Sequence, residues 1–498
     1  MSVLLLGYLR FRILGAGGAP PTIDSGNWLA YGDQLFGGGV RSSTIVYPPV
    51  VPLLAKASVG AFGLVGGISL LGSVASTAPA IGIYLTLRWL GMDTRALAPA
   101  LLVLGASSTG EATAWGGFPQ LIGLGLMPVT LVAVDRLTRT WSRRDAFVVG
   151  ILLAGVLATS HFIGAITVIG AGLVALLGIT SRSASRPRGR RGAEALGLVI
   201  LPLIWLAPLY ITLFQAFGNA SRSAPFFNEL SWGNLIDQVE FLYRDLRWLW
   251  RFLLGIALLA VPVFAVKRRT PLWRITTALL GAIVTALALT RESRFLYVLT
   301  PYAALGLALW ISHGADLGSQ ITRRLGRSWA NRRVAALSVV VLMALAVWQA
   351  AAGLDFFESQ RDTYAVLNEE LVEGIEHVRD ATGPGTVLAV TSLNDAPVGW
   401  WVEAITQRET FYGAPLRWLL FEDEIRRATV ANAVFVPPFP NPNGLQLASQ
   451  AGIDLILVPT RWVFYDEDEM EALARENPGS VEQINDELVL VRPGALNR

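Results

Sequence analysis

Long apolar runs separated by short polar links fill the first two thirds of the chain. Ten such runs lie at 66–90, 96–111, 117–135, 145–160, 161–180, 195–217, 247–267, 271–290, 295–313 and 334–353, and a weaker, shorter first run lies at 3–18. A membrane-spanning helix needs about 20 apolar residues, and most of these runs approach that length. The pattern therefore predicts an all-α polytopic membrane domain of about eleven transmembrane helices over 1–353.

The pattern changes after residue 353, where acidic clusters replace the apolar runs. Helical periodicity near 362–381, 417–430 and 443–451 alternates with β-branched runs at 386–391 and 454–458 and with a closing pair of strands around 481–492. About 145 residues are enough to bury a core. We expect a small α/β domain over 354–498.

Composition supports a membrane protein. Of the 498 residues, 53% are apolar and only 15% are charged, whereas about a quarter of the residues of a soluble protein are charged. The chain has no cysteine, which excludes disulfides, thiolate metal sites and a cysteine nucleophile.

Arginine-rich links predict the orientation of the membrane domain. They lie at 136–144, 182–191, 267–269 and 323–333, and the positive-inside rule makes them cytoplasmic. The run 182–191 is then a topology anchor that contacts anionic lipid rather than a nucleic-acid site.

This assignment is consistent only if the proline-led segment 48–63 does not cross the membrane. We therefore expect interfacial helices in a first outer loop over 19–65. The N-terminus is then cytoplasmic and the C-terminal domain extracytoplasmic, in a multi-pass protein of the cell membrane.

Two acids stand at the expected outer edge of the membrane domain. Asp24 lies in a polar loop just before an aromatic helix, and Glu111 lies among small residues and glycines. Asp24 is either a solvated loop acid or a general base, and Glu111 is either a boundary residue or a second acid of the same cleft. In one cavity the two acids would split base and orienting roles or flank a divalent cation. No Asp-x-Asp pair or histidine cluster supports a metal, so none is assigned.

Arginines on the predicted outer side are candidates for binding phosphate. Arg291 and Arg294 stand at the mouth between two predicted spans, and Arg222 lies in a long outer loop. A guanidinium group binds phosphate through two hydrogen bonds, which suits a lipid-phosphate donor. Snorkelling or pairing with Glu292 is the alternative role for Arg291 and Arg294.

Further polar and aromatic residues are candidates for lining the same cavity. They are Tyr47, which precedes a Pro-Pro step, Trp115, which follows Glu111, and His161 at a tight apolar hairpin. In the tail, Trp400 and Trp401 precede Phe411. Aromatic residues of this kind stack on sugars or pack a domain onto a membrane surface, and packing is the favoured interpretation here.

Four short motifs resemble the GT-C superfamily of integral-membrane glycosyltransferases, which includes protein O-mannosyltransferases and aminoarabinose transferases. The motifs are Asp24 in the first outer loop, Tyr47 to Pro49 after it, the acid Glu111, and the step from Arg294 to Tyr297. The resemblance covers the architecture of about 1–353. Several relatives carry a pair of acids where this chain has only Asp24.

The resemblance implies transfer of a sugar, of hexosyltransferase or pentosyltransferase type, from a polyprenyl-phosphate donor to an acceptor on the extracytoplasmic face. It implies that Asp24 is the base and that Arg291 and Arg294 bind the donor phosphate, with membrane lipid as a further partner. A transporter or lipid flippase and a non-catalytic cell-envelope protein remain alternatives, and the sequence leaves the oligomeric state open.

Overall fold

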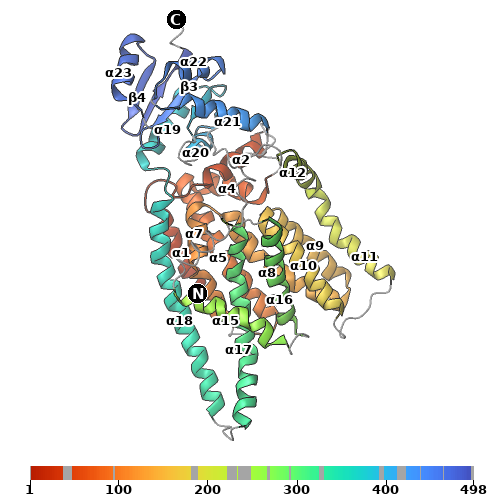
Figure 1. Ribbon diagram of the computed structural model, residues 1–498. Helices are drawn as coiled ribbons and strands as arrows, with labels where there is room; N and C mark the ends of the chain where they lie inside the picture. The colour runs from red at the N-terminus through yellow and green to blue at the C-terminus, as the bar shows by residue number, and fades with distance from the viewer. Residues whose placement is uncertain are drawn as a thin grey trace.

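The structure is a computed structural model of the chain. It describes residues 2–37, 47–92, 96–180, 189–220, 233, 248–265, 270–290, 293–324, 330–391, 398–411, 422–437, 439–463 and 465–494. A bundle of long helices makes up most of the molecule, and a small domain with a β-sheet sits at one end of it (Figure 1).

The bundle begins with α1 (Ser2–Leu14) and continues after the first loop with α5 (Leu64–Trp89). Its further helices are α6 (Leu97–Leu104), α7 (Ser107–Trp115), α8 (Phe118–Thr140), α9 (Arg143–Leu157), α10 (His161–Thr180), α11 (Gly189–Ile200), η2 (Leu201–Leu206), α12 (Ala207–Ala220), α15 (Trp248–Val263), α16 (Pro271–Thr290), η4 (Ser293–Val298), α17 (Leu299–Arg324) and α18 (Ala330–Thr363). The chain is thus a mostly helical membrane protein.

Within the described residues, six helical segments are long and apolar enough to cross a membrane. They are Leu64–Trp89, Phe118–Thr140, His161–Thr180, Arg191–Gln215, Pro271–Thr290 and Arg294–His313. Several other helices are shorter than the roughly 20 residues of a full span. The described residues therefore do not establish the eleven crossings that the sequence predicts.

One predicted span is wrong in its continuity. The run 96–111 forms two helices, α6 and α7, which are separated after Leu104. The carbonyl groups at the break have side-chain partners: Arg10 donates to Leu104 O, and Gln349 Nε2 donates to Gly105 O at 2.9 Å. A buried carbonyl group without a hydrogen-bond partner is unfavourable. These donors therefore stabilise the break, after which the chain continues as the separate helix α7.

A buried ion pair joins two helices of the bundle. Arg274 of α16 contacts Asp135 of α8 at 2.6 Å, with both side chains almost fully buried. Arg139, one turn after Asp135, contacts the same carboxylate at 3.1 Å. Burying a charge is costly unless it is paired, so the guanidinium groups allow Asp135 to lie inside the bundle.

The first loop forms two helices between the bundle and the sheet domain (Figure 1). They are α2 (Ser25–Gly37) and α4 (Val50–Phe62), in the region where the sequence predicts interfacial helices. Lys56 of α4 forms an ion pair with Asp33 of α2. This pair fixes the two helices against each other.

The small domain is built on a five-stranded sheet in the order β2-β1-β3-β5-β4. Its elements are α19 (Glu369–Ala381), β1 (Val387–Val390), α20 (Val398–Thr406), β2 (Glu409–Thr410), α21 (Glu422–Val434), α22 (Pro442–Gln450), β3 (Leu455–Pro459), α23 (Glu467–Glu476), β4 (Val481–Asn485) and β5 (Leu488–Val491). β1 pairs in parallel with β2 and β3, and β5 pairs antiparallel with β3 and β4.

Helices cover both faces of this sheet. Successive residues of a strand point to opposite faces, so the strands contribute side chains to two apolar clusters. Leu388 and Leu457 pack towards α19 and α20, whereas Ala389 and Ile456 pack with Phe435 on the other face. The strands expected at 386–391, 454–458 and 481–492 and the helix expected at 443–451 are present with shifted ends. The helix expected near 362–381 begins later, at Glu369, and the first part of the helix expected at 417–430 lies outside the described residues, which resume in α21 at Glu422. The sequence pattern did not predict α20 and α23.

The sheet domain and the membrane part share one apolar core. The cluster on the α19–α20 face continues through Trp401 into Trp28 of α2, Val51 of α4 and Phe118 of α8. In addition, α18 runs on to Thr363, so the expected boundary at 353/354 falls inside a helix. The two parts are thus packed together rather than joined only by a linker.

Candidate functional site

Asp24 stands immediately before α2, at the end of the loop that leads into it. Its backbone N–H donates to the carbonyl of Trp115 at 2.9 Å, and its own carbonyl accepts from Trp28 N at 3.3 Å as the helix begins. The indole of Trp28 donates to Gly116 O at 2.8 Å. The main chain of Asp24 is therefore fixed to the turn that ends α7.

Gly116 makes this contact possible. It has a φ of +94°, and a Cβ atom there would lie 3.1 Å from Asp24 N and 3.2 Å from Asp24 Cβ. A side chain is unfavourable at such a positive φ and would also crowd the acid. Glycine at this turn thus allows both the left-handed backbone conformation that ends α7 and the close approach of Asp24.

Tyr47 lies beside Asp24 in an aromatic cluster. Its ring centroid is 4.8 Å from that of Trp28, 5.3 Å from that of Tyr31 and 5.9 Å from that of His161. Burial raises the pKa of the Tyr47 phenol well above its usual range, and the nearby charge of Asp24 raises it further. The hydroxyl therefore remains protonated and is available as a hydrogen-bond donor near the acid.

Glu111 lies one helical turn before Trp115 on α7, so the two side chains share a face of the helix. The hydroxyl of Tyr364, just after α18, donates to Glu111 Oε1 at 3.4 Å. Burial raises the pKa of Tyr364, and the charge of Glu111 adds to this shift. The indole of Trp115 donates to Tyr297 OH at 3.4 Å.

Arg294 lies in η4, three residues before Tyr297. Its guanidinium stacks on the ring of Phe162, with Cζ 4.8 Å from the ring centroid. Phe162 follows His161, whose ring packs against Tyr47, and Tyr297 accepts from the indole of Trp115. The structure thus gathers one cation and two acids, contributed by three distant segments, around a pair of tyrosines.

His161 begins α10 and extends the aromatic cluster. Its ring packs edge-on against Tyr47, and it lies 5.7 Å from the ring of Tyr210. Asp24, Glu111, Arg294, Tyr47, Trp115 and His161 therefore lie in one region, whereas Arg291 and Arg222 fall outside the described residues.

Two tyrosines of this region were not candidates for the site from the sequence. Tyr297 was noted only as the end of the motif that starts at Arg294, although a spacing of three residues places both on one face of a short helix. Tyr364 is 253 positions from Glu111, so no local pattern links them. Across the described part of the chain, no group of three or more His, Cys, Asp or Glu side chains is arranged to hold a metal ion.

Comparison with solved structures identifies the fold. ArnT from Cupriavidus metallidurans bound to undecaprenyl phosphate matches 99% of this chain and 97% of its own, with a TM-score of 0.61 and 12% sequence identity. The apo state of the same protein matches 99% and 98%, with a TM-score of 0.59 and 13% identity. The chain has the fold of ArnT.

This match confirms the fold that the resemblance to the GT-C membrane glycosyltransferases implied. No protein-family model matches the chain, and no curated protein matches it by sequence. Because the sequence identity with ArnT is only 12–13%, the comparison shows a shared fold and does not assign residues of the site.

Proposed function

We propose that this protein is a membrane glycosyltransferase that moves a sugar from a polyprenyl-phosphate donor to an acceptor on the extracytoplasmic face. The observation that carries the proposal is a row of packed rings between Asp24 and Arg294. Trp28, whose backbone N–H donates to Asp24 O, packs on Tyr47, and Tyr47 packs on His161. Arg294 stacks on Phe162, the next residue in the chain. The fold adds support, because the ArnT structure that matches nearly the whole chain is bound to undecaprenyl phosphate.

Asp24 and Arg294 have the charges that this reaction needs. Asp24 takes the proton of an acceptor hydroxyl as that oxygen attacks the anomeric carbon of the sugar. The bond from that carbon to the phosphate oxygen breaks, and the phosphate leaves with the electron pair. Arg294 balances the charge that develops on the phosphate, and in-line attack inverts the anomeric configuration.

Tyr47, Glu111 and Trp115 have supporting roles in this proposal. In this proposal the protonated hydroxyl of Tyr47 donates to a reacting group when substrates are bound. Glu111 is the second acid and orients the acceptor from α7, and Trp115 and His161 line the cavity. The arginine-rich links support a position of this region at the outer face, because the positive-inside rule makes those links cytoplasmic.

Binding of lipid phosphate tests the donor site. Purified protein in nanodiscs is titrated with undecaprenyl phosphate and, as a control for the tail, with undecaprenol. Arg294→Gln is expected to weaken binding of the phosphate about tenfold or more and to leave undecaprenol unchanged, since it removes a charge-assisted contact.

The matched control is Arg144→Gln, an exposed arginine at the start of α9. It should leave both titrations unchanged. Equal binding of undecaprenyl phosphate to wild-type protein and Arg294→Gln would contradict the donor site. A transporter or flippase with this fold would instead bind the phosphate without any turnover of a lipid-linked sugar.

A further inference from the structure

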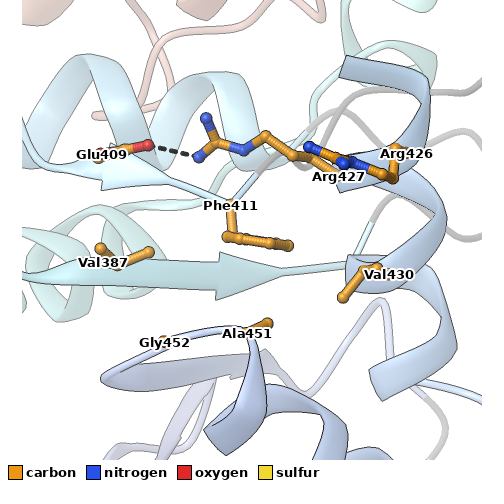
Figure 2. A pocket seen from close by; sticks show the side chains of 8 residues that line it. All are labelled: Val387, Glu409, Phe411, Arg426, Arg427, Val430, Ala451 and Gly452. Atoms are coloured by element: carbon orange, nitrogen blue, oxygen red, sulfur yellow. Dashed lines mark hydrogen bonds and ion pairs between the residues drawn. The ribbon is translucent and has the colours of Figure 1, made fainter. Parts of the chain in front are cut away.

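A pocket outside this region opens on the sheet domain. Its cavity has a volume of about 400 Å³, within the range of small-molecule sites. It lies at the β2 edge of the sheet, between β1, the start of α21 and the turn after α22 (Figure 2). Val387, Val430 and Ala451 form an apolar wall, and Phe411 stands in the centre.

Arg427 crosses the pocket above Phe411 (Figure 2). Its Cζ atom lies 4.9 Å from the centroid of the Phe411 ring. Its Nη2 atom donates to Glu409 Oε1 and, at 3.4 Å, to Thr410 O. Its Nε atom is buried and, among the described residues, has no hydrogen-bond partner.

This arrangement leaves part of the arginine fork unused. A guanidinium group donates through two neighbouring nitrogens to the two oxygens of a carboxylate or phosphate. Here Glu409 accepts from Nη2 alone, and a buried donor without an acceptor is unfavourable. With a shift of this partly exposed side chain, an incoming oxygen anion would supply the acceptor that Nε lacks.

The charges of the pocket favour a single negative charge on the ligand. Arg426 is exposed and lines the pocket next to Arg427. Glu409 balances one of the two guanidinium groups, so the pocket carries one formal positive charge in excess. The apolar wall and the Phe411 ring favour a ligand with a ring, because aromatic faces bind flat apolar surfaces.

We propose that this pocket is a binding site for a small ring compound that carries one carboxylate, of the size of a sugar acid or an aromatic acid. The anionic group binds at Arg426 and Arg427, and the ring lies against Phe411 and the apolar wall. The site does not depend on the transferase activity proposed above.

The pocket is linked to the first-loop helix by hydrogen bonds. Thr410, between Glu409 and Phe411 in sequence, donates to Glu403 Oε2 at 2.7 Å, and Gln34 of α2 donates to Glu403 Oε1 at 2.7 Å. The edge strand that forms the pocket is therefore joined through α20 to the helix that begins after Asp24.

Four probes test the site by calorimetric titration of the full-length protein in detergent. D-glucuronate and benzoate combine a ring with a carboxylate, D-glucose has the ring alone, and inorganic phosphate has the anion alone. At least one of the two carboxylates should bind saturably, and glucose and phosphate should each bind at least about tenfold more weakly. Comparing the affinities of glucuronate and benzoate shows whether the pocket prefers a sugar acid or an aromatic acid.

Three variants assign any binding to the pocket. Arg426→Gln changes an exposed residue and should weaken the bound carboxylate about tenfold, as should Arg427→Gln. The control is Arg461→Gln, because Arg461 also stacks on an aromatic ring of this domain, that of Trp462, but lies outside the pocket. It should leave the affinity unchanged.

Four results would overturn the proposal. They are no saturable binding of either carboxylate, binding that Arg426→Gln leaves intact, glucose binding as tight as that of the carboxylates, and phosphate binding as tight as theirs. The third result would remove the role of the charge, and the fourth would remove the role of the ring.

Discussion

Asp24 donates its backbone N–H to the carbonyl of Trp115 at 2.9 Å. This hydrogen bond fixes the loop acid to the end of the helix that carries Glu111 one turn earlier. An isolated loop aspartate would have no defined position relative to a second acid. The residues that carry the two carboxylates are instead joined through α7, which follows a break where Arg10 and Gln349 donate to the carbonyls of Leu104 and Gly105.

Gly116→Ala should displace Asp24. The substitution places a Cβ atom 3.1 Å from Asp24 N at a φ of +94°, so it combines backbone strain with crowding. Gly91→Ala is the matched control, because Gly91 has a φ of +83° with nothing within 4 Å of its Cβ position. We expect both to lower the midpoint of thermal unfolding and only Gly116→Ala to lower sugar transfer. If both variants lost sugar transfer equally, the contact between Gly116 and Asp24 would not be what positions the acid.

Trp401→Ala should loosen the sheet domain from the first-loop helix. The Trp401 side chain is fully buried, its indole donates to Thr22 O at 3.1 Å, and its backbone and ring lie against Gly26 of α2. Truncating a buried tryptophan costs about 3–5 kcal/mol.

Trp400→Ala, on the half-buried neighbour, is the control and should cost less. Limited proteolysis and thermal unfolding of the two variants measure the difference. If Trp400→Ala destabilised the protein as much as Trp401→Ala, the shared core would not hold the domain. Trp401→Phe should cost less than Trp401→Ala but more than the about 1 kcal/mol of the hydrogen bond to Thr22, because the smaller ring also leaves a cavity.

Tyr364 should make the protein less stable at alkaline pH. Its pKa is raised in the folded state by burial and by Glu111. Above a pH of about 10 the unfolded chain loses this proton while the folded chain keeps it, so stability falls as pH rises. Tyr364→Phe should flatten the fall between about pH 10 and 11 in denaturation measurements. An unchanged slope would mean that burial and Glu111 do not raise the pKa of Tyr364.

The sequence predicts the membrane class and most elements of the C-terminal domain because both depend on local periodicity. It also places an acid before an aromatic helix, and α2 begins at Ser25 as that pattern implies. The break between α6 and α7 is not predictable in this way, since its partners Arg10 and Gln349 lie on distant helices.

The same limit applies to the candidate site. Asp24, Glu111 and Arg294 are recognisable as charged residues next to apolar runs, where each is costly without a role. Their common neighbourhood is a tertiary property. Tyr364 is the clearest case, because it reaches Glu111 only through the path of α18. Trp401 matches the packing role that the sequence favours, whereas Phe411 lines the pocket.

The most direct test of the central claim is turnover by Asp24→Asn. Purified protein in nanodiscs is given polyprenyl-phosphate-linked pentoses and hexoses with cell-envelope acceptors, and release of polyprenyl phosphate is measured. The wild-type protein should turn over at least one donor, and Asp24→Asn should slow it by about 10²–10⁴-fold with unchanged thermal unfolding, because the amide cannot accept the proton. Asp380→Asn, on an exposed aspartate of α19, should behave as wild type. Transfer by Asp24→Asn at the wild-type rate would contradict the assignment of Asp24 as the base.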